Sequence, residues 1–200
     1  NPGFNENSID KIPKVVSGYS SRCLSVISHF YKESFKKVVK AKNLEIAEFS
    51  KLLENIYRSV NIGFVNEMKL VADKMNLDIF EILKIAKTKP YGFNSFEPGP
   101  GVGGHCIPID PNYLHWKADK LGIEPKFIKL SERVNLNVLK FIIIKLEKIR
   151  RSKNFDKKKF NVLILGLSYK KNIDDLRESA SLRLINYLIK HKIKYEFSDP

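Results

Sequence analysis

The part of the sequence with the clearest chemical potential is a glycine- and proline-rich segment that contains a cysteine. Residues 99–111 read GPGVGGHCIPIDP, so Cys106 follows a run of closely spaced glycines. Such glycines let backbone N–H groups approach a phosphate or an oxyanion. A thiol just before a helix N-terminus is favoured as the thiolate, the nucleophilic form of cysteine. The residues alone leave two interpretations open: a covalent nucleophile, or a cysteine buried in an irregular loop.

Two neighbours of Cys106 carry groups that can transfer protons. His105 is adjacent in the sequence, and because adjacent side chains diverge, we assign it a structural role. Asp110 is followed by Pro111 and a helical pattern, which is typical of an N-cap residue with proline at the first helical position. We therefore expect the Asp110 carboxylate to cap this helix and also to face the cysteine.

Four more polar residues stand where ligands commonly bind. Lys51 and Asn55 are four apart in a helical pattern and so share one helix face, although an exposed position is the simpler interpretation of such a lysine. Lys170 and Arg177 follow a short apolar run that ends at Gly166, and α/β folds bind ligands at the carboxyl ends of their strands. The turn lacks a complete GxGxxG pattern, which makes it a weak cofactor signal.

Helical periodicity dominates the chain before residue 152. Apolar residues recur at helical spacing over residues 43–86, where Gly63 and residues 75–78 are possible interruptions. Asp78 is suited to cap a short helix at the end of this stretch. Residues 91–111 contain too many glycines and prolines for a helix or a central strand. We expect the remaining helices over residues 20–39, 112–121 (ending before Gly122) and 126–151.

The pattern changes after the basic run of residues 153–159. Residues 161–166 read NVLILG, which is typical of a buried parallel strand that meets its first turn. Residues 180–190 then predict a crossover helix, and residues 194–198 a second strand. The fold class is therefore a mostly α-helical domain followed by the start of an α/β, Rossmann-like domain. Two strands and one helix make a poor independent domain, so we expect a truncated one.

Composition excludes several other classes of protein. No stretch reaches the roughly 18–20 apolar residues of a membrane span, and the first residues lack the pattern of a signal peptide. Cys23 and Cys106 form no disulfide framework, which favours a cytoplasmic location. The formal net charge of +14 would suit nucleic acid, but the lysines are spread along the chain. We expect neither a nucleic-acid nor a membrane partner.

Taken together, four separated segments resemble the UDP-glucose/GDP-mannose dehydrogenase family. They are NPGF (1–4) with IPKVVSG (12–18), EFSKLLEN (48–55), the cysteine segment (99–111) and GLSYKKNIDDLRES (166–179). The resemblance covers essentially the whole chain, and the cysteine segment is its most specific part. It implies that residues 1–19 end an NAD-binding domain, residues 20–152 form a central helical domain that dimerises with a second copy, and residues 153–200 begin a UDP-binding domain.

The resemblance also implies a reaction, the NAD-dependent four-electron oxidation of the C6 alcohol of a UDP-sugar to a carboxylate. Cys106 would trap the intermediate aldehyde as a thiohemiacetal, which becomes a thioester and is released by water. Lys51 and Asn55 would donate hydrogen bonds to the developing oxyanion and position water, and Asp110 would assist proton transfer. The residues implied for ligand binding are Phe96, Gly99, Gly103 and Lys170 for the nucleotide-sugar and Arg177 for NAD.

Within the family, residues 88–93 and 104–118 are most similar to the branch that acts on UDP-N-acetylglucosamine, since the UDP-glucose branch usually carries serine at the position of His105. UDP-glucose and UDP-N-acetylmannosamine are the alternative substrates. The family's NAD-binding glycine pattern is not among these residues, so we expect the 200 residues alone not to turn over substrate. An alternative of another class is a helical oligomerisation module built on the apolar stripe of residues 44–75.

Overall fold

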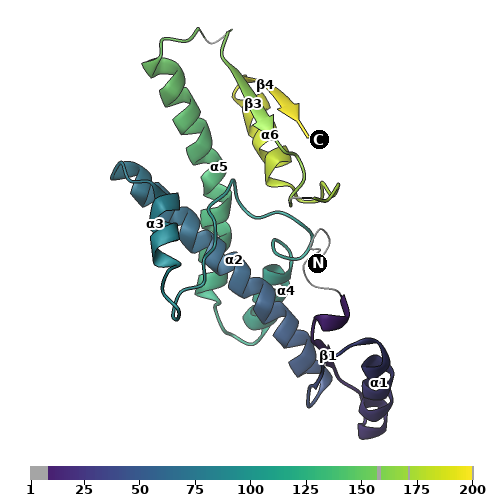
Figure 1. Cartoon of the computed structure of the whole chain (residues 1–200). Coiled ribbons are helices and arrows are strands. Elements are labelled where there is room, and N and C mark those ends of the chain that lie inside the picture. The colour runs from purple at the N-terminus through teal and green to yellow at the C-terminus, as the bar shows by residue number, and fades with distance from the viewer. Residues whose placement is uncertain (1–8, 157–158, 171, 200) are drawn as a thin grey trace. The chain divides into compact units, whose positions relative to one another are not determined.

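A computed structural model describes residues 9–156, 159–170 and 172–199 of the chain (Figure 1). The opening NPGF segment of the resemblance lies outside these residues. Contacts divide the chain into two compact units, Asn1–Glu54 and Asn55–Pro200. Helix α2 (Leu44–Lys74) contributes residues to both units. The predicted domain boundaries at residues 19 and 152 stay predictions.

The first unit contains a short parallel strand pair joined by a helix. A 3₁₀ turn (Ile9–Lys11) precedes β1 (Lys14–Val16), α1 (Ser21–Ser34) and β2 (Val38–Lys40). Register runs from Lys14 opposite Val38 to Val16 opposite Lys40. The expected helix over residues 20–39 is therefore wrong in its last part. It ends at Ser34 because Phe35 is extended, and the β-branched valines that follow pair with β1 instead of continuing the helix.

The second unit contains the helices expected from the periodicity. After α2 come α3 (Ile79–Ala86), α4 (Asp110–Lys120) and α5 (Lys126–Ser152). The Asp78 side chain caps α3 by accepting a hydrogen bond of 2.8 Å from the Phe80 N–H, as expected. Gly63 does not interrupt α2. A Cβ atom at Gly63 would lie 3.1 Å from Cβ of Ser131, so the missing side chain allows α2 and α5 to approach closely.

The α/β part confirms the predicted order of strand, helix and strand. Strand β3 (Asn161–Leu165), helix α6 (Ala180–Lys190) and strand β4 (Lys194–Ser198) form one βαβ unit. The strands are parallel, with Asn161 opposite Lys194 and Leu165 opposite Ser198. Figure 1 shows α6 lying along this strand pair. Ser179 begins α6 by accepting hydrogen bonds from the Ser181 and Leu182 N–H groups.

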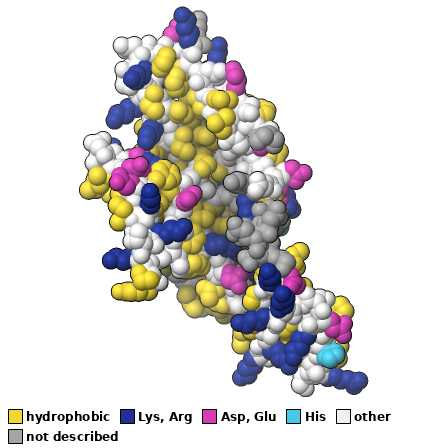
Figure 2. Space-filling model, viewed as in Figure 1, with side chains coloured by type: hydrophobic (Ala, Val, Ile, Leu, Met, Phe, Trp, Pro, Cys, Tyr) yellow, Lys and Arg dark blue, Asp and Glu magenta, His cyan; other side chains and the backbone are white. Residues whose placement is uncertain are grey.

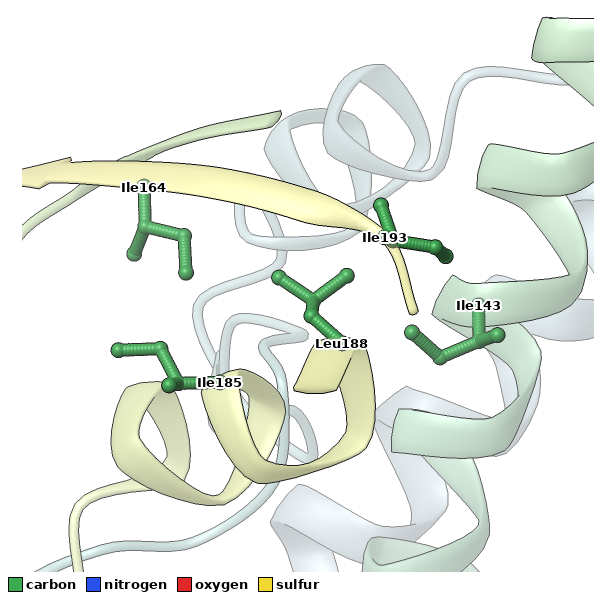
Figure 3. Close-up of a cluster of buried hydrophobic side chains, with 5 residues drawn as sticks. All are labelled: Ile143, Ile164, Ile185, Leu188 and Ile193. Carbon is green, nitrogen blue, oxygen red and sulfur yellow. The ribbon is translucent and has the colours of Figure 1, made fainter. Parts of the chain in front are cut away.

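A cluster of aliphatic side chains fastens the βαβ unit to α5 (Figure 3). Leu188 of α6 is fully buried at its centre, and such burial contributes about 1.5–3 kcal/mol. Ile143 supplies the contact from α5, and Ile164 and Ile185 supply contacts from β3 and α6. Helix α5 thus buries apolar side chains of the two-stranded unit that would otherwise be exposed, and this burial stabilises the unit.

The surface reflects the basic composition. Figure 2 shows lysine and arginine side chains spread over the visible face rather than gathered in one patch. Within the described part of the chain, no helix is both long and apolar enough to cross a membrane.

Candidate functional site at the cysteine loop

Cys106 is exposed, at the start of the turn that leads into α4. Its carbonyl accepts hydrogen bonds from the N–H groups of Ile109 (3.2 Å) and Asp110 (2.9 Å). These bonds make one helical turn, so the cysteine lies directly before the positive end of the α4 dipole. The exposure is incompatible with a cysteine buried as a structural residue, which was the alternative left open by the sequence.

Asp110 does not cap α4, and this expectation was wrong. The N-cap position is Ile109, without a side-chain cap bond, and Asp110 is already the first helical residue. Its carboxylate instead accepts a hydrogen bond from the Asn55 amide of α2. Because the Asn55 side chain is fully buried, its amide needs a partner, and Asp110 supplies one. The structure therefore brings two of the predicted catalytic residues into direct contact.

A third residue, Arg58, extends this contact and was missed by the sequence reasoning. Its guanidinium donates a hydrogen bond to the Asn55 side-chain oxygen, three residues earlier on α2. The Asn55 amide is thereby oriented from both ends: its oxygen accepts from Arg58 and its nitrogen donates to Asp110. The i,i+3 spacing on a helix was the available signal. The resulting Arg58–Asn55–Asp110 relay holds an ionisable carboxylate one turn after Cys106.

Lys51 belongs to the first unit, Asn1–Glu54. Its side chain is 59% exposed, and Nζ lies 3.9 Å from a Glu54 carboxylate oxygen. These are the surroundings of a surface lysine with a weak ion pair. Its role towards an oxyanion stays a prediction.

A buried pair of asparagines holds the first glycine of the loop. The Gly99 N–H donates to the Asn66 side-chain oxygen over 2.9 Å, and the Asn66 amide donates to the Asn135 side-chain oxygen over 2.9 Å. The Asn135 amide in turn donates to the Ser59 carbonyl over 3.3 Å. Asn66 and Asn135 are 1% and 4% exposed. Neither was predicted, although a polar residue inside an apolar helical stripe is a detectable signal.

The last two glycines of the loop pack against the turn that follows β3. A Cβ at Gly103 would lie 2.8 Å from Cβ of Tyr169, and one at Gly104 would lie 2.7 Å from the Tyr169 ring. Gly104 also has a φ of +86°, a left-handed conformation that favours glycine. Its N–H donates to the Arg177 carbonyl over 3.2 Å. The glycines therefore allow the loop to pack closely against Tyr169 and the backbone of Arg177 and Glu178.

Two of the predicted ligand-binding side chains are Phe96, in the loop before the glycines, and Lys170, in the turn that follows β3. Phe96 is half-buried, with its ring edge-on to the Tyr57 ring at 5.8 Å between centroids. Lys170 is half-buried and follows Tyr169 in the turn against which Gly103 packs. The structure thus places Gly103 beside the segment that carries Lys170. Nucleotide-sugar binding by these residues stays a prediction.

Arg177 forms an ion pair within its own turn. Its guanidinium bonds Asp175, with Nη2 2.6 Å from Oδ2 and Nε 3.0 Å from Oδ1. Hydrogen bonding from Arg177 lowers the pKa of Asp175 to about 2, and the same bonds raise the pKa of Arg177. The Arg177 side chain is 68% exposed. Its predicted contact with NAD is therefore compatible with its exposure and stays a prediction.

The turn after β3 does not have the form of a dinucleotide cradle. The N–H groups of Leu167 and Ser168 donate to the Asp199 carboxylate over 2.6 and 3.0 Å. An anion bound there would have to displace this carboxylate. Among the described residues there is also no cluster of His, Cys, Asp and Glu suited to a metal ion.

The geometry defines a class of protein: a helical domain with an exposed cysteine loop, packed on a parallel βαβ unit. Residues 45–137 match the model of the central domain of the UDP-glucose/GDP-mannose dehydrogenase family. Residues 163–200 match the model of the UDP-binding domain of the same family. The chain belongs to this family, and the predicted fold class is confirmed.

Several relatives match the whole chain or nearly all of it. It is 33% identical over 201 residues to a UDP-N-acetyl-D-glucosamine 6-dehydrogenase of Pseudomonas aeruginosa, covering 100% of this chain and 47% of that protein. It is 34% identical to a UDP-N-acetyl-D-mannosamine dehydrogenase of Campylobacter jejuni, covering 86% and 40%. A solved UDP-D-ManNAc dehydrogenase from Pyrococcus horikoshii shares 29% identity with a TM-score of 0.86, covering 95% and 44%. The chain spans about half the length of these relatives.

Proposed function

We propose that the protein oxidises the C6 alcohol of a UDP-sugar to a carboxylate, with Cys106 as the covalent nucleophile and NAD as the oxidant. The observation that carries this proposal is the exposed Cys106 directly before α4, one helical turn ahead of Asp110, whose carboxylate a buried asparagine holds in place. Membership of the family and the names of the relatives support a UDP-sugar as substrate.

In this mechanism the chain supplies the nucleophile and the proton acceptor. When bound, NAD⁺ supplies the hydride acceptor, and the described residues do not cradle it. The C6 alcohol would first lose a hydride and a proton to become an aldehyde. The Cys106 sulfur would bond to the aldehyde carbon while its oxygen takes up the thiol proton, and the resulting thiohemiacetal would lose a second hydride and a proton to become a thioester. The four electrons thus require two equivalents of NAD⁺. Water cleaves the C–S bond, which releases the acid and the free thiol. Asp110 would exchange the proton, Asn55 would fix the orientation of Asp110, and Lys51 would stabilise the oxyanion.

We propose an N-acetylated UDP-hexosamine as the substrate, with UDP-N-acetylglucosamine first. The similarity of residues 88–93 and 104–118 to that branch supports this choice, as do relatives named for N-acetylglucosamine and N-acetylmannosamine. The loop of Phe96, Gly99 and Gly103 would contact the nucleotide-sugar together with Lys170. Arg177 would contact NAD, for which its exposed guanidinium is suited.

The test is turnover by the complete gene product, followed as NADH absorbance at 340 nm with UDP-N-acetylglucosamine, UDP-N-acetylmannosamine or UDP-glucose. Cys106→Ser should abolish acid formation while UDP-sugar binding, measured by calorimetry, stays nearly unchanged. Cys23→Ser is the matched control and should keep full activity, because Cys23 lies on α1, outside the segments assigned to the site. Acid formation by Cys106→Ser near the parent rate would refute the proposal.

A second function is favoured by an apolar groove on α2 and α3. The groove has a volume of about 500 Å³ and is lined mainly by hydrophobic side chains, including Phe64, Met68 and Leu83. Phe64 is 55% exposed and Met75 is 62% exposed. We propose that a second copy covers this face and makes a homodimer through the central helices. Analytical ultracentrifugation of Phe64→Glu should then show a smaller species than the parent. Phe127→Glu, which changes a phenylalanine of α5 that is even more exposed (77%), should not.

A further inference from the structure

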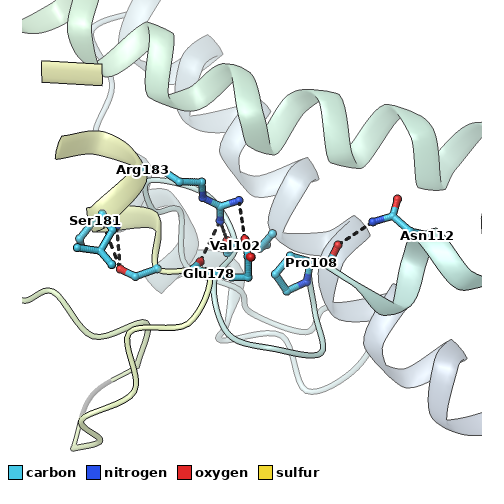
Figure 4. Close-up of polar contacts among 8 residues, drawn as sticks. Val102, Pro108, Asn112, Glu178, Ser181 and Arg183 are labelled. Atoms are coloured by element: carbon cyan, nitrogen blue, oxygen red, sulfur yellow. Dashed lines mark hydrogen bonds and ion pairs between the residues drawn. The ribbon is translucent and has the colours of Figure 1, made fainter. Parts of the chain in front are cut away.

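Arg183 connects helix α6 to the cysteine loop. Its Nη2 donates hydrogen bonds to the carbonyl of Val102, in the loop, and to the carbonyl of Glu178 over 3.1 Å (Figure 4). Its Nη1 lies 3.9 Å from the Glu178 carboxylate. Val102 lies within the residues that match the central-domain model and Arg183 within those that match the UDP-binding-domain model. One side chain therefore bonds both parts.

The Arg183 side chain is largely buried where it contacts the cysteine loop. The side chain is 28% exposed, and its Nε is buried without a partner among the described residues. Burying part of a guanidinium is unfavourable unless its remaining donors are bonded. The bonds from Nη2 to Val102 and Glu178 meet this requirement in part, and because Nε has no partner, losing the Val102 carbonyl would leave a further buried donor unpaired.

Glu178 shows that the backbone here is held in an unfavourable conformation. Its φ is +51°, in the left-handed region that residues other than glycine seldom adopt. The same carbonyl that accepts from Arg183 would lie 3.1 Å from a Cβ at Gly103. The left-handed residue thus turns its carbonyl toward both the arginine and the glycine loop.

We propose that Arg183 is a positioning residue that fixes the Val102 turn of the cysteine loop against α6 and thereby sets the geometry of Cys106. The inference rests on the proposed function only in that Cys106 is the reacting group. Both bonds leave Nη2, which the planar guanidinium holds at a fixed distance and angle from the stem, whereas a lysine carries a compact charge on a flexible stem. The proposal therefore predicts that lysine cannot replace Arg183, although it keeps the positive charge.

The test is the rate of alkylation of Cys106 by iodoacetamide between pH 6 and 9. It is made in a Cys23→Ser background, because a hydrogen bond from Ser20 lowers the pKa of the exposed Cys23 thiol and would make that residue react as well. Arg183→Met and Arg183→Lys should both slow alkylation at neutral pH by at least about threefold, since a displaced loop no longer holds the Cys106 sulfur in its position before the N-terminus of α4.

The matched control is Arg150→Met. Arg150 is also largely buried, also bonds a carboxylate, Glu147, and also donates to a backbone carbonyl, that of Phe155. Arg150→Met should change the alkylation rate of Cys106 less than about 1.5-fold, even if the substitution lowers the melting temperature. A purely structural Arg183 would behave in the same way, and a parent-like rate in folded Arg183→Lys would overturn the proposal. If Arg183→Met slows alkylation and Arg183→Lys does not, the effect comes from the positive charge alone, and the proposed positioning role is likewise refuted.

This readout is independent of turnover. If Cys106→Ser keeps its activity while Arg183→Lys slows alkylation, the proposed function fails and the positioning role stands. If Cys106→Ser is inactive while Arg183→Lys alkylates at the parent rate, the reverse holds. Circular dichroism of each variant establishes that it is folded. Where Arg183→Met does not fold, Arg183→Lys decides the outcome.

Discussion

Replacing Asn66 with alanine removes the side chain that joins the glycine loop to α5. The Asn66 amide group is 1% exposed in the structure and makes two hydrogen bonds of 2.9 Å, one from the Gly99 N–H and one to the Asn135 oxygen. Alanine preserves the helix, because it has the highest helix propensity. The effect of Asn66→Ala therefore reports on the two lost hydrogen bonds and on a small cavity.

The magnitude follows from what is left without a partner. An unsatisfied buried polar group costs about 1–3 kcal/mol. Asn135 is 4% exposed, so its oxygen bears this cost in full, whereas Gly99 is half-buried and water can reach its N–H. We expect the free energy of unfolding to fall by about 2–4 kcal/mol, which for a chain of this size lowers the melting temperature by roughly 4–16 °C.

Urea unfolding followed by circular dichroism measures the free energy, and amide hydrogen exchange at Gly99 measures the local effect. Asn112→Ala is the matched control: this asparagine is exposed, and its side-chain amide donates to the Pro108 carbonyl over 3.1 Å. It should lose less than about 0.5 kcal/mol. Equal losses in the two variants, or unchanged exchange at Gly99 in Asn66→Ala, would refute the reasoning that the buried amide positions the loop.

Three further predictions concern packing and charge. Leu188→Ala should reduce the free energy of unfolding by about 2–5 kcal/mol in urea titrations, because Leu188 is fully buried. Gly63→Ala should cost about 1–3 kcal/mol in the same assay despite its better helix propensity, because the new Cβ would lie 3.1 Å from Ser131. The pKa of Asp175 is lowered from 3.8 to about 2. Its ion pair with Arg177 therefore stabilises the folded state above pH 3.8, and this stabilisation is lost as the pH falls from 3.8 through about 2. In Arg177→Met, carboxyl NMR titration of Asp175 should show a pKa raised towards 3.8 but still below it, because the backbone N–H of residue 177 still donates to the carboxylate; an unchanged pKa would contradict this cause.

Local patterns predicted most elements because each pattern reports a local preference. The helical spacing of α2 and α5 and the apolar run of β3 recur in the structure within one or two residues of the expected bounds. The failure at β2 has a non-local cause: Val38 and Val39 lie in a strand because β1, more than twenty residues earlier, offers them backbone partners. A helical spacing that continues past Ser34 cannot reveal a partner so distant in the sequence.

The sequence by itself indicated the family and the segments that make up the candidate site, since a glycine run before Cys106 and the motif around Lys51 and Asn55 could be found without coordinates. Only the tertiary structure decided how the site is held. Asp110 bonds Asn55 instead of capping α4, Asn66 and Asn135 hold Gly99, and Arg183 reaches Val102 from α6. These partners are separated by 33 to 81 positions in the chain. Which polar groups meet depends on how the helices pack, because a buried donor takes whichever acceptor that packing brings within reach.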